Sequence, residues 1–267
     1  MAKQRFAGKI ALVTGCGAAG PGWGNGKATA VLLARDGAKV FGCDIDLRAA
    51  EETRDLIRKE GAQCEVRVTD VGKTDQVKAL VDDCIEHFGR IDVLVNNVGI
   101  SGNGGPVECP EDKWRRDLDV NITSMFLTCK YVLPHMERQG GGSIVNISSL
   151  SAIRSVSVSS VSYDTTKAAV LGFSRSVALR YAKRNIRSNV VLPGLIRTPT
   201  AEQVIGDYVE QWGKQPPMGL PGEAWDIAEA VLYLASDAAK YVTATELIVD
   251  GGLAAKMAVN DGSLDDN

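Results

Sequence analysis

Short apolar runs alternate with helix-periodic segments along the whole chain, and this alternation limits the folds open to it. The runs are rich in Val, Ile and Leu, which is typical of strands buried on both faces of a parallel sheet. A strand, a helix and a second strand in succession form a right-handed βαβ unit. Strands are predicted at residues 10–13, 39–43, 64–68, 91–95, 142–147, 186–192 and 246–249.

Helical periodicity fills the intervals between the predicted strands. Several of these segments end at a glycine, the residue that most often follows the last turn of a helix. Helices are predicted at residues 27–36, 46–60, 75–88, 111–138, 161–183 and 224–235. The expected fold class is therefore α/β, with one Rossmann-like doubly wound domain and a seven-stranded parallel sheet flanked by helices.

The 267 residues are enough for one such domain, and no linker or internal repeat divides them. We expect residues 1–256 to form the domain and residues 257–267 to be a polar, flexible tail. With 30 basic and 33 acidic residues, the chain is not expected to bind nucleic acid or membrane. The start lacks a secretory h-region, and the six cysteines form no C-x-x-C pair. These features predict a cytoplasmic protein with reduced thiols and no metal site.

A cluster of glycines follows the first predicted strand directly and precedes the first helix, between Gly15 and Gly26. Glycines at that point let the backbone turn sharply and approach a phosphate group, which the helix N-terminus then holds. No G-K-[ST] sequence follows, so the turn is not a Walker-type loop. The arrangement predicts a dinucleotide site.

Asp44 ends the second predicted strand, where an acidic residue can accept hydrogen bonds from the adenosine ribose and repel a 2′-phosphate. Its alternative role is to cap the following helix, although Asp46 suits that role at least as well. Nearby, only Arg48 could meet a 2′-phosphate. The sequence therefore favours NAD over NADP.

Tyr163 and Lys167 are four residues apart on a predicted helix, so the phenol and the ammonium group point into the same space. A cation beside a tyrosine favours the phenolate and is expected to lower the tyrosine pKa toward neutrality. Upstream, the strand at 142–147 ends in Ser148 and Ser149, at the sheet edge where the nucleotide should lie. A serine there could hold a carbonyl or alcohol oxygen while the tyrosine exchanges its proton.

Together these features resemble the short-chain dehydrogenase/reductase family, from about residue 8 to residue 252. The resemblance rests on six motifs in the family's order rather than on any one of them. The motifs are Thr14-Gly15…Gly24-Asn25-Gly26, Thr69-Asp70-Val71, Asn96-Asn97-Val98-Gly99, Val120-Asn121, Ser149…Tyr163-x-x-x-Lys167 and Pro193-Gly194…Thr198.

The resemblance implies a role for each matching residue. Tyr163 would be the general acid/base, and Ser149 would bind the reacting oxygen, so both would touch substrate. Lys167 would lower the tyrosine pKa and bind the nicotinamide ribose, and Asn121 would hold a water that links the lysine to solvent. Asp70 and Val71 would contact adenine. The other implied cofactor residues are Gly15, Gly24, Asn25, Gly26, Asp44, Asn97, Gly99, Pro193, Ile196 and Thr198, with Tyr163 and Lys167.

The chain departs from the family pattern at three points. The glycine turn is enlarged, which leaves open which glycines contact phosphate and whether Trp23 covers the pyrophosphate or packs on the protein. Val98 replaces the usual alanine. The interval from Ser149 to Tyr163 is one residue longer than the family's, so Ser149 is preferred over Ser148 as the catalytic serine but not established.

The expected function is hydride transfer between NAD(H) and a secondary alcohol or ketone with a cyclic, aryl or acyl-type skeleton. Two alternatives remain: an NADPH-dependent 3-oxoacyl reductase, and a catalytically silent dinucleotide-binding protein. The substrate is expected against the loop from Thr198 to about Gly222 and the loops 100–109 and 150–160. Its apolar candidates are Trp212, Pro216, Pro217 and Met218. Family resemblance also implies a homotetramer that pairs residues 120–138 and 161–183.

Overall fold

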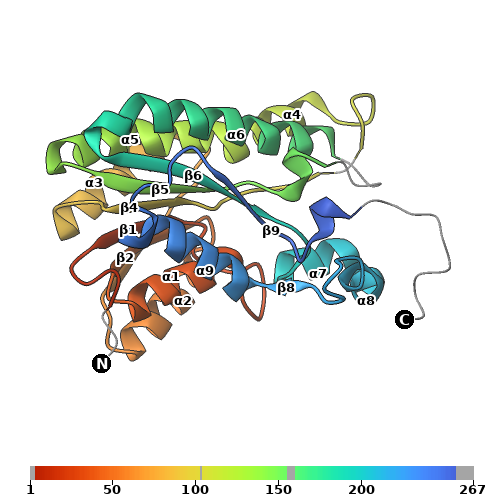
Figure 1. The fold of residues 1–267 in the computed structure, drawn as a ribbon, viewed down its shortest axis with the longest axis horizontal. Helices are drawn as coiled ribbons and strands as arrows, with labels where there is room; N and C mark the ends of the chain where they lie inside the picture. Colours follow the sequence, from red (N-terminus) through yellow and green to blue (C-terminus); the bar gives the residue numbers. More distant parts are fainter. Residues whose placement is uncertain (1–3, 103, 155–159, 257–267) are drawn as a thin grey trace.

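The computed structural model describes residues 4–102, 104–154 and 160–256. Its centre is a seven-stranded sheet in the order β3-β2-β1-β4-β5-β6-β9, with every neighbouring pair parallel (Figure 1). This confirms the predicted fold class. The strands are β1 (Ile10–Thr14), β2 (Lys39–Asp44), β3 (Cys64–Val68), β4 (Val93–Asn96), β5 (Gly142–Ile147), β6 (Ile186–Pro193) and β9 (Glu246–Val249).

Helices cover both faces of the sheet (Figure 1). On one face lie α1 (Asn25–Arg35), α2 (Leu47–Lys59) and α9 (Ala224–Ala235), and on the other α3 (Thr74–Phe88), α4 (Glu111–Leu118), α5 (Ser124–Gln139) and α6 (Val161–Tyr181). Strand residues alternate between two separate cores. Val13 packs with α1 and α9 residues, whereas Leu12 packs with residues of α3 and α5. Burial on both faces explains why the strands read as continuous apolar runs.

Several helices end at a glycine or begin at a capping side chain, as their sequences indicate. Gly89 and Gly140 follow α3 and α5 with φ of 77° and 88°, in the left-handed region. Asp46 caps α2 by accepting a hydrogen bond from the Arg48 N–H at 2.9 Å. The predicted helical span 111–138 is interrupted by a π-helical turn, Asp119–Thr123, which carries Asn121.

Strand order reverses between β1 and β4, and the crevice at this point opens at the carboxyl ends of the strands. Beside the crevice, the chain after β6 forms β7 (Ile196–Arg197), α7 (Pro199–Ile205), α8 (Val209–Gly213) and β8 (Gly222–Glu223). This region was expected to be a loop, but it contains two short helices that stand at one end of the sheet (Figure 1).

The predicted tail, 257–267, lies outside the described residues, as do residue 103 and residues 155–159 of the two predicted substrate loops. In the part of the chain that is described, no helix is both long and apolar enough to cross a bilayer. The same part contains no group of three or more His, Cys, Asp or Glu side chains that could hold a metal ion.

Candidate active site

A cavity of about 1090 Å³ runs along the carboxyl ends of the strands. The glycine turn and the end of β2 line one end of it, and β5, α6, α7 and α8 line the other. Pockets for one small ligand usually enclose about 300–1,000 Å³. The cavity therefore has room for an extended ligand and a second, smaller molecule beside it.

The glycine turn brings the start of α1 against the end of β1. A Cβ atom on Gly26 would lie 1.9 Å from the carbonyl oxygen of Gly15, so no larger residue fits there. Gly15 itself has φ of 65°, which glycine adopts without strain. Gly24 is the N-cap of α1, so the free N–H groups of the first turn face the cavity. Gly24, Asn25 and Gly26 thus lie where the cavity meets the start of α1.

Asn25, between these glycines, has an unsatisfied polar atom. Its Oδ1 atom is buried and has no hydrogen-bond partner among the described residues, and the residue lines the cavity. Buried polar atoms normally have partners, and an unsatisfied one at a helix N-terminus indicates that a ligand completes it. Oδ1 is an acceptor, so it fits a hydroxyl group or a water, whereas the free N–H groups at the start of α1 fit a dinucleotide phosphate group.

Part of the enlarged turn packs against the protein rather than lining the cavity. The ring of Trp23 lies 4.3 Å from the ring of Trp225 on α9, and Lys27 lies over Trp23 at 5.4 Å. Gln203 of α7 donates a hydrogen bond to the carbonyl of Ala19 at 2.9 Å. Of the two roles considered for Trp23, the structure supports packing on the protein, and Trp23 does not line the cavity.

Two roles were left open for Asp44, binding of the adenosine ribose and capping of α2. Asp46 caps α2, while Asp44 accepts hydrogen bonds from the N–H groups of Gly17 at 3.0 Å and Asp46 at 3.1 Å. Asp44 lines the cavity at the end of β2, which is the position expected for a ribose-binding carboxylate. The side chain of Arg48 is 89% exposed and lies 3.6 Å from Glu52, so it is turned to solvent.

The next residues along the cavity are held by the protein itself. Asp70 accepts hydrogen bonds from Gly72 N–H and the Arg116 guanidinium, each at 3.0 Å, and Val71 is buried beside it. Asn97 donates to the carbonyls of Thr14 at 3.2 Å and Gly15 at 3.0 Å, so it fixes the glycine turn to β4. All three residues line the cavity.

Lys167 lies beneath Tyr163 at the junction of β5 and α6. It is 3% exposed, its Nζ donates to the carbonyl of Ile147 at 3.1 Å, and it lies 5.6 Å from the tyrosine ring centroid. Burial lowers the pKa of Lys167 to about 8. A Cβ on Gly99 would come within 2.8 Å of the same Nζ atom, so glycine leaves room for the lysine.

The pKa of Tyr163 differs from the expectation. Burial raises it above the ordinary tyrosine value, and the hydrogen bond with Ser149 offsets only part of that effect. Desolvation of the phenolate is therefore the largest effect on this pKa, and the charge of Asp164 adds to it. The proximity of phenol, ammonium and serine is as predicted, but the direction of the tyrosine pKa is not.

The two candidate serines have different partners. Ser148 is 3% exposed and donates its hydroxyl to the carbonyl of Lys167 at 2.8 Å, so it ties β5 to α6. Ser149 accepts from the N–H of Ser151 at 3.1 Å, and its hydroxyl is near enough to the phenol to lower the pKa of Tyr163. Ser149 is thus the serine whose hydroxyl faces the tyrosine.

Asn121 is fully buried and its side chain is fully engaged. It accepts from the N–H of Ile100 at 2.8 Å, and donates to the carbonyl of Ile100 at 2.8 Å and to Thr166 Oγ1 at 3.0 Å. These bonds join the segment after β4 to α6, which carries Tyr163. Asn121 is therefore more than a polar residue on a helix surface, although its side chain has little capacity left to bind water.

The remaining predicted residues close the far side of the cavity. Pro193, at the end of β6, and Ile196 and Thr198, after it, all line the cavity. Thr198 also caps α7 by accepting from the N–H of Ala201 at 3.2 Å. Among the apolar substrate candidates, Trp212 lines the cavity. Pro216, Pro217 and Met218 do not; they pack beside Gly251 and Gly252 instead.

Sequence reasoning missed two residues of α6. Asp164 lines the cavity next to Tyr163, and Thr166 binds Asn121. Their helical spacing was available as a signal, since Asp164 is four residues after Ser160 and shares its face. The sequence alone did not show that this face of α6 borders the cavity.

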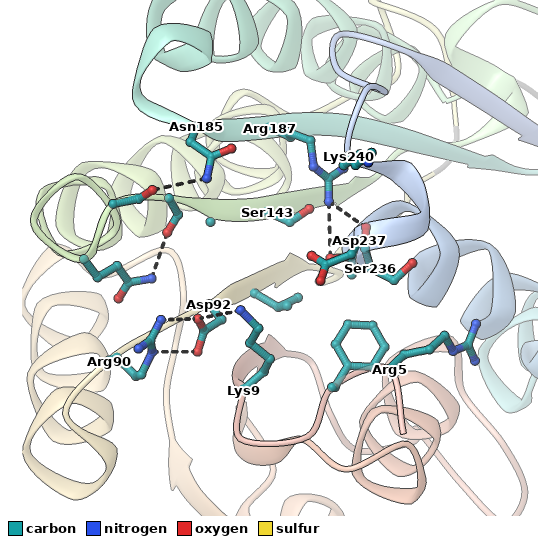
Figure 2. A pocket seen from close by; sticks show the side chains of 17 residues that line it. Arg5, Lys9, Arg90, Asp92, Ser143, Asn185, Arg187, Ser236, Asp237 and Lys240 are labelled. Atoms are coloured by element: carbon teal, nitrogen blue, oxygen red, sulfur yellow. Dashed lines mark hydrogen bonds and ion pairs between the residues drawn. The ribbon is translucent and has the colours of Figure 1, made fainter. Parts of the chain in front are cut away.

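A second cavity, of about 200 Å³, lies at the amino ends of the strands, opposite the first cavity. Figure 2 shows Arg90 and Lys9 converging there on Asp92, which is 7% exposed and also accepts the N–H of Ile10 at 2.9 Å. Arg187 donates to carbonyls at the end of α9, the nearest being Leu234 at 2.6 Å. Asp92 is paired with Lys9 and Arg90, and Arg187 with backbone carbonyls, so these groups already have partners within the protein. We therefore take the larger cavity as the candidate active site.

A doubly wound parallel sheet with a glycine turn at its switch point defines a Rossmann-like dinucleotide-binding protein, and Ser149, Tyr163 and Lys167 line the same cavity as the turn. Comparison with known proteins agrees. A family model described as Enoyl-(Acyl carrier protein) reductase matches residues 17–254. The 3-oxoacyl-(acyl-carrier-protein) reductase of Thermotoga maritima is 37% identical over 254 residues, which are 94% of this chain and 99% of that protein.

Two solved structures are similar over nearly the whole chain. A protein of Burkholderia xenovorans described as a short-chain dehydrogenase/reductase has a TM-score of 0.92 and 44% identity, covering 96% of this chain and 100% of that one. A 7α-hydroxysteroid dehydrogenase complexed with NADH and 7-oxo glycochenodeoxycholic acid has a TM-score of 0.88 and 36% identity, covering 94% and 96%. The chain belongs to the short-chain dehydrogenase/reductase family and is an oxidoreductase that acts on alcohols or ketones.

Proposed function

We propose that the protein transfers a hydride between NAD(H) and a secondary alcohol or ketone, with Tyr163 as the general acid/base. The observation that carries the proposal is the convergence of Ser149, Tyr163 and Lys167 on one cavity that also contains the glycine turn and Asp44. Such a site holds the two reactants together and so supplies proximity as well as proton transfer.

When bound, the nicotinamide ring supplies or accepts the hydride. Tyr163 Oη exchanges the proton of the substrate hydroxyl, and Ser149 Oγ donates a hydrogen bond to the same oxygen as its charge develops. Lys167 holds a positive charge beneath the tyrosine and binds the nicotinamide ribose. Asn121 fastens the lysine's helix to the segment after β4, and a water held beside it would relay the proton to solvent.

The cofactor residues we propose are distributed along the cavity. Gly15, Gly24, Asn25 and Gly26 would hold the pyrophosphate at the start of α1. Asp44 would bind the adenosine ribose, and its charge opposes a 2′-phosphate, which favours NAD over NADP. Adenine would lie against Asp70 and Val71, and the nicotinamide half against Asn97, Gly99, Tyr163, Lys167, Pro193, Ile196 and Thr198.

The substrate end of the cavity favours a ring or a medium-length chain. Its lining includes the apolar residues Val204, Ile205, Tyr208 and Trp212. The 7-oxo steroid bound to the similar dehydrogenase is a cyclic ketone, which fits this preference. NADPH-dependent reduction of a 3-oxoacyl substrate is the second candidate, favoured by the similarity to the Thermotoga maritima reductase. A silent dinucleotide-binding protein is disfavoured by the complete Ser149, Tyr163 and Lys167 set.

The test is a dehydrogenase screen over cyclic, aryl and acyl-type secondary alcohols, read as NADH or NADPH formation by absorbance. We expect turnover of a cyclic alcohol with NAD. Turnover confined to 3-hydroxyacyl thioesters with NADP would establish the second candidate. NADH binding without turnover of any alcohol, and without reduction of the matching ketones, would indicate the silent protein.

We also propose a homotetramer and a cytoplasmic location, with residues 1–256 as the single domain. Exposed apolar side chains on the outer helices, Phe126 on α5 and Leu179 on α6, support the first. Free thiols, five of them buried, support the second. Light scattering tests the tetramer: a monomeric mass at micromolar concentration would contradict it.

A further inference from the structure

Asp164 belongs to the face of α6 that borders the active-site cavity. Ser160, Tyr163, Asp164 and Lys167 follow the spacing i, i+3, i+4, i+7, which places residues on one side of a helix. All four line the cavity. The carboxyl group of Asp164 therefore lies beside the tyrosine rather than on the outer surface of α6.

Asp164 is half-buried and has no partner within the described residues. Desolvation by burial is the cause that raises its pKa, with no hydrogen bond or nearby cation to oppose it. Its charge in turn raises the pKa of Tyr163, so the carboxylate is close enough to the phenol to act on it. A carboxylate in this state gains from any hydrogen-bond donor that enters the cavity.

The other charged residues that line the cavity are in different places. Asp44, Asp46, Asp70 and Arg116 lie at the end where the adenosine half is proposed, and Lys167 is buried beneath the tyrosine. The described lining from α7 and α8 is apolar or neutral, with Val204, Trp212 and Gln211 among its members. Asp164 therefore gives the described lining of the substrate end a negative charge.

We propose that Asp164 forms a subsite that accepts a hydrogen bond from a second hydroxyl or an ammonium group of the substrate, and that it rejects substrates with a carboxylate there. The proposal rests on the proposed function and narrows its substrate class to neutral or cationic alcohols and ketones. A second donor group satisfies the carboxylate in the desolvated site, whereas a substrate carboxylate would place two like charges together.

The test compares three alcohols that differ in one substituent: cyclohexane-1,4-diol, 4-aminocyclohexanol and 4-hydroxycyclohexanecarboxylate. Their kcat/KM values with NAD are measured for the wild type, for Asp164→Asn, which keeps the shape and removes the charge, and for Asp112→Asn, an exposed carboxylate on α4. We expect Asp164→Asn to shift the ratio of hydroxy acid to amino alcohol toward the acid by at least about tenfold, the order of one charged hydrogen bond. Asp112→Asn should leave the ratio unchanged.

A binding measurement separates this proposal from the proposed function. Calorimetry with saturating NADH compares the dissociation constants of the amino alcohol and the hydroxy acid for the same three proteins, and it needs no turnover. A shift of the binding ratio in Asp164→Asn supports the subsite even if no alcohol is oxidised. An equal effect of Asp164→Asn on both compounds, in kcat/KM or in binding, would overturn the subsite while leaving hydride transfer intact.

Discussion

The Nζ atom of Lys167 lies 5.6 Å from the ring centroid of Tyr163 and donates a hydrogen bond to the carbonyl of Ile147 at 3.1 Å. At 3% exposure the lysine has lost nearly all its water, which lowers its pKa to about 8. A cation held this deep costs stability, a cost that proteins commonly carry at functional sites. Its position is explained by the phenol beside it.

Tyr163→Phe tests the acid/base role. Removing the hydroxyl leaves the ring but takes away the proton donor, so kcat should fall at least ~10²-fold, the low end for general acid-base catalysis. Steady-state kinetics measures the loss, and NADH titration should give a nearly unchanged dissociation constant. Tyr181→Phe, at the far end of α6, is the matched control. Near-normal turnover of Tyr163→Phe would refute the assignment.

Lys167→Met should stabilise the cofactor-free protein and abolish activity. The lysine pKa is about 8 when folded and 10.5 as the ordinary value, a difference worth about 3 kcal/mol at pH 7. Between these two values the unfolded chain holds more protons, so wild-type stability rises with pH over that window. The stabilisation of Lys167→Met, measured by denaturant unfolding, should therefore shrink from pH 7 to pH 10.

Lys183→Met provides the control, because that lysine is exposed and its replacement should give no pH-dependent difference. Ionisation of Tyr163 makes the folded protein less stable as the pH rises above 10, because the pKa of this tyrosine is raised in the folded state. The comparison is therefore made below that pH. A pH-independent gain in Lys167→Met would show that packing, and not the buried charge, is responsible.

Asp44→Ala should change the cofactor preference. Loss of the carboxylate removes a ribose acceptor and a repulsive charge, so the ratio of kcat/KM for NAD to that for NADP should fall at least about tenfold, equivalent to about 1.4 kcal/mol. Asp75→Asn, an exposed carboxylate on α3 away from Arg48, controls for net charge. Should the ratio stay the same in Asp44→Ala, another residue reads the ribose.

Gly26→Ala and Gly20→Ala separate two kinds of glycine in one turn. A Cβ on Gly26 would lie 1.9 Å from Gly15 O, whereas one on Gly20 would meet only ordinary contacts, at 3.5 Å from Pro199 Cβ. We expect Gly26→Ala to lose NADH binding and to destabilise the fold by more than about 3 kcal/mol, beyond the usual range of overpacking. Gly20→Ala should retain both. Thermal unfolding and NADH titration are the measurements.

Local patterns were sufficient to predict most of the architecture. Strands that are buried on both faces are mostly apolar, so Ile10–Thr14 and Gly142–Ile147 could be identified from their runs of Ile, Leu and Val. Helix boundaries followed from residues with local effects, such as Gly89 and Asp46. The two short helices after β6 were missed because their sequence has weak helical periodicity. Their conformation depends on contacts with the rest of the fold.

Within the site, the sequence identified the residue types and their order but not their partners. Ser148 and Ser149 are adjacent and chemically identical, and only the approach of α6 gives one to the Lys167 carbonyl and the other to Tyr163. The same holds for Trp23, whose partner is Trp225 on a distant helix. The raised tyrosine pKa was not foreseen because desolvation depends on everything that surrounds the phenol.

The sequence by itself therefore determined the parallel sheet, the glycine turn and the spacing of tyrosine and lysine, because each depends on backbone conformation over a few residues. The tertiary structure decided which serine faces the tyrosine, how deeply Lys167 is buried and that Asp164 borders the cavity. Burial and pairing are set by segments far apart in the chain that meet only after folding, so their energies have no local signature.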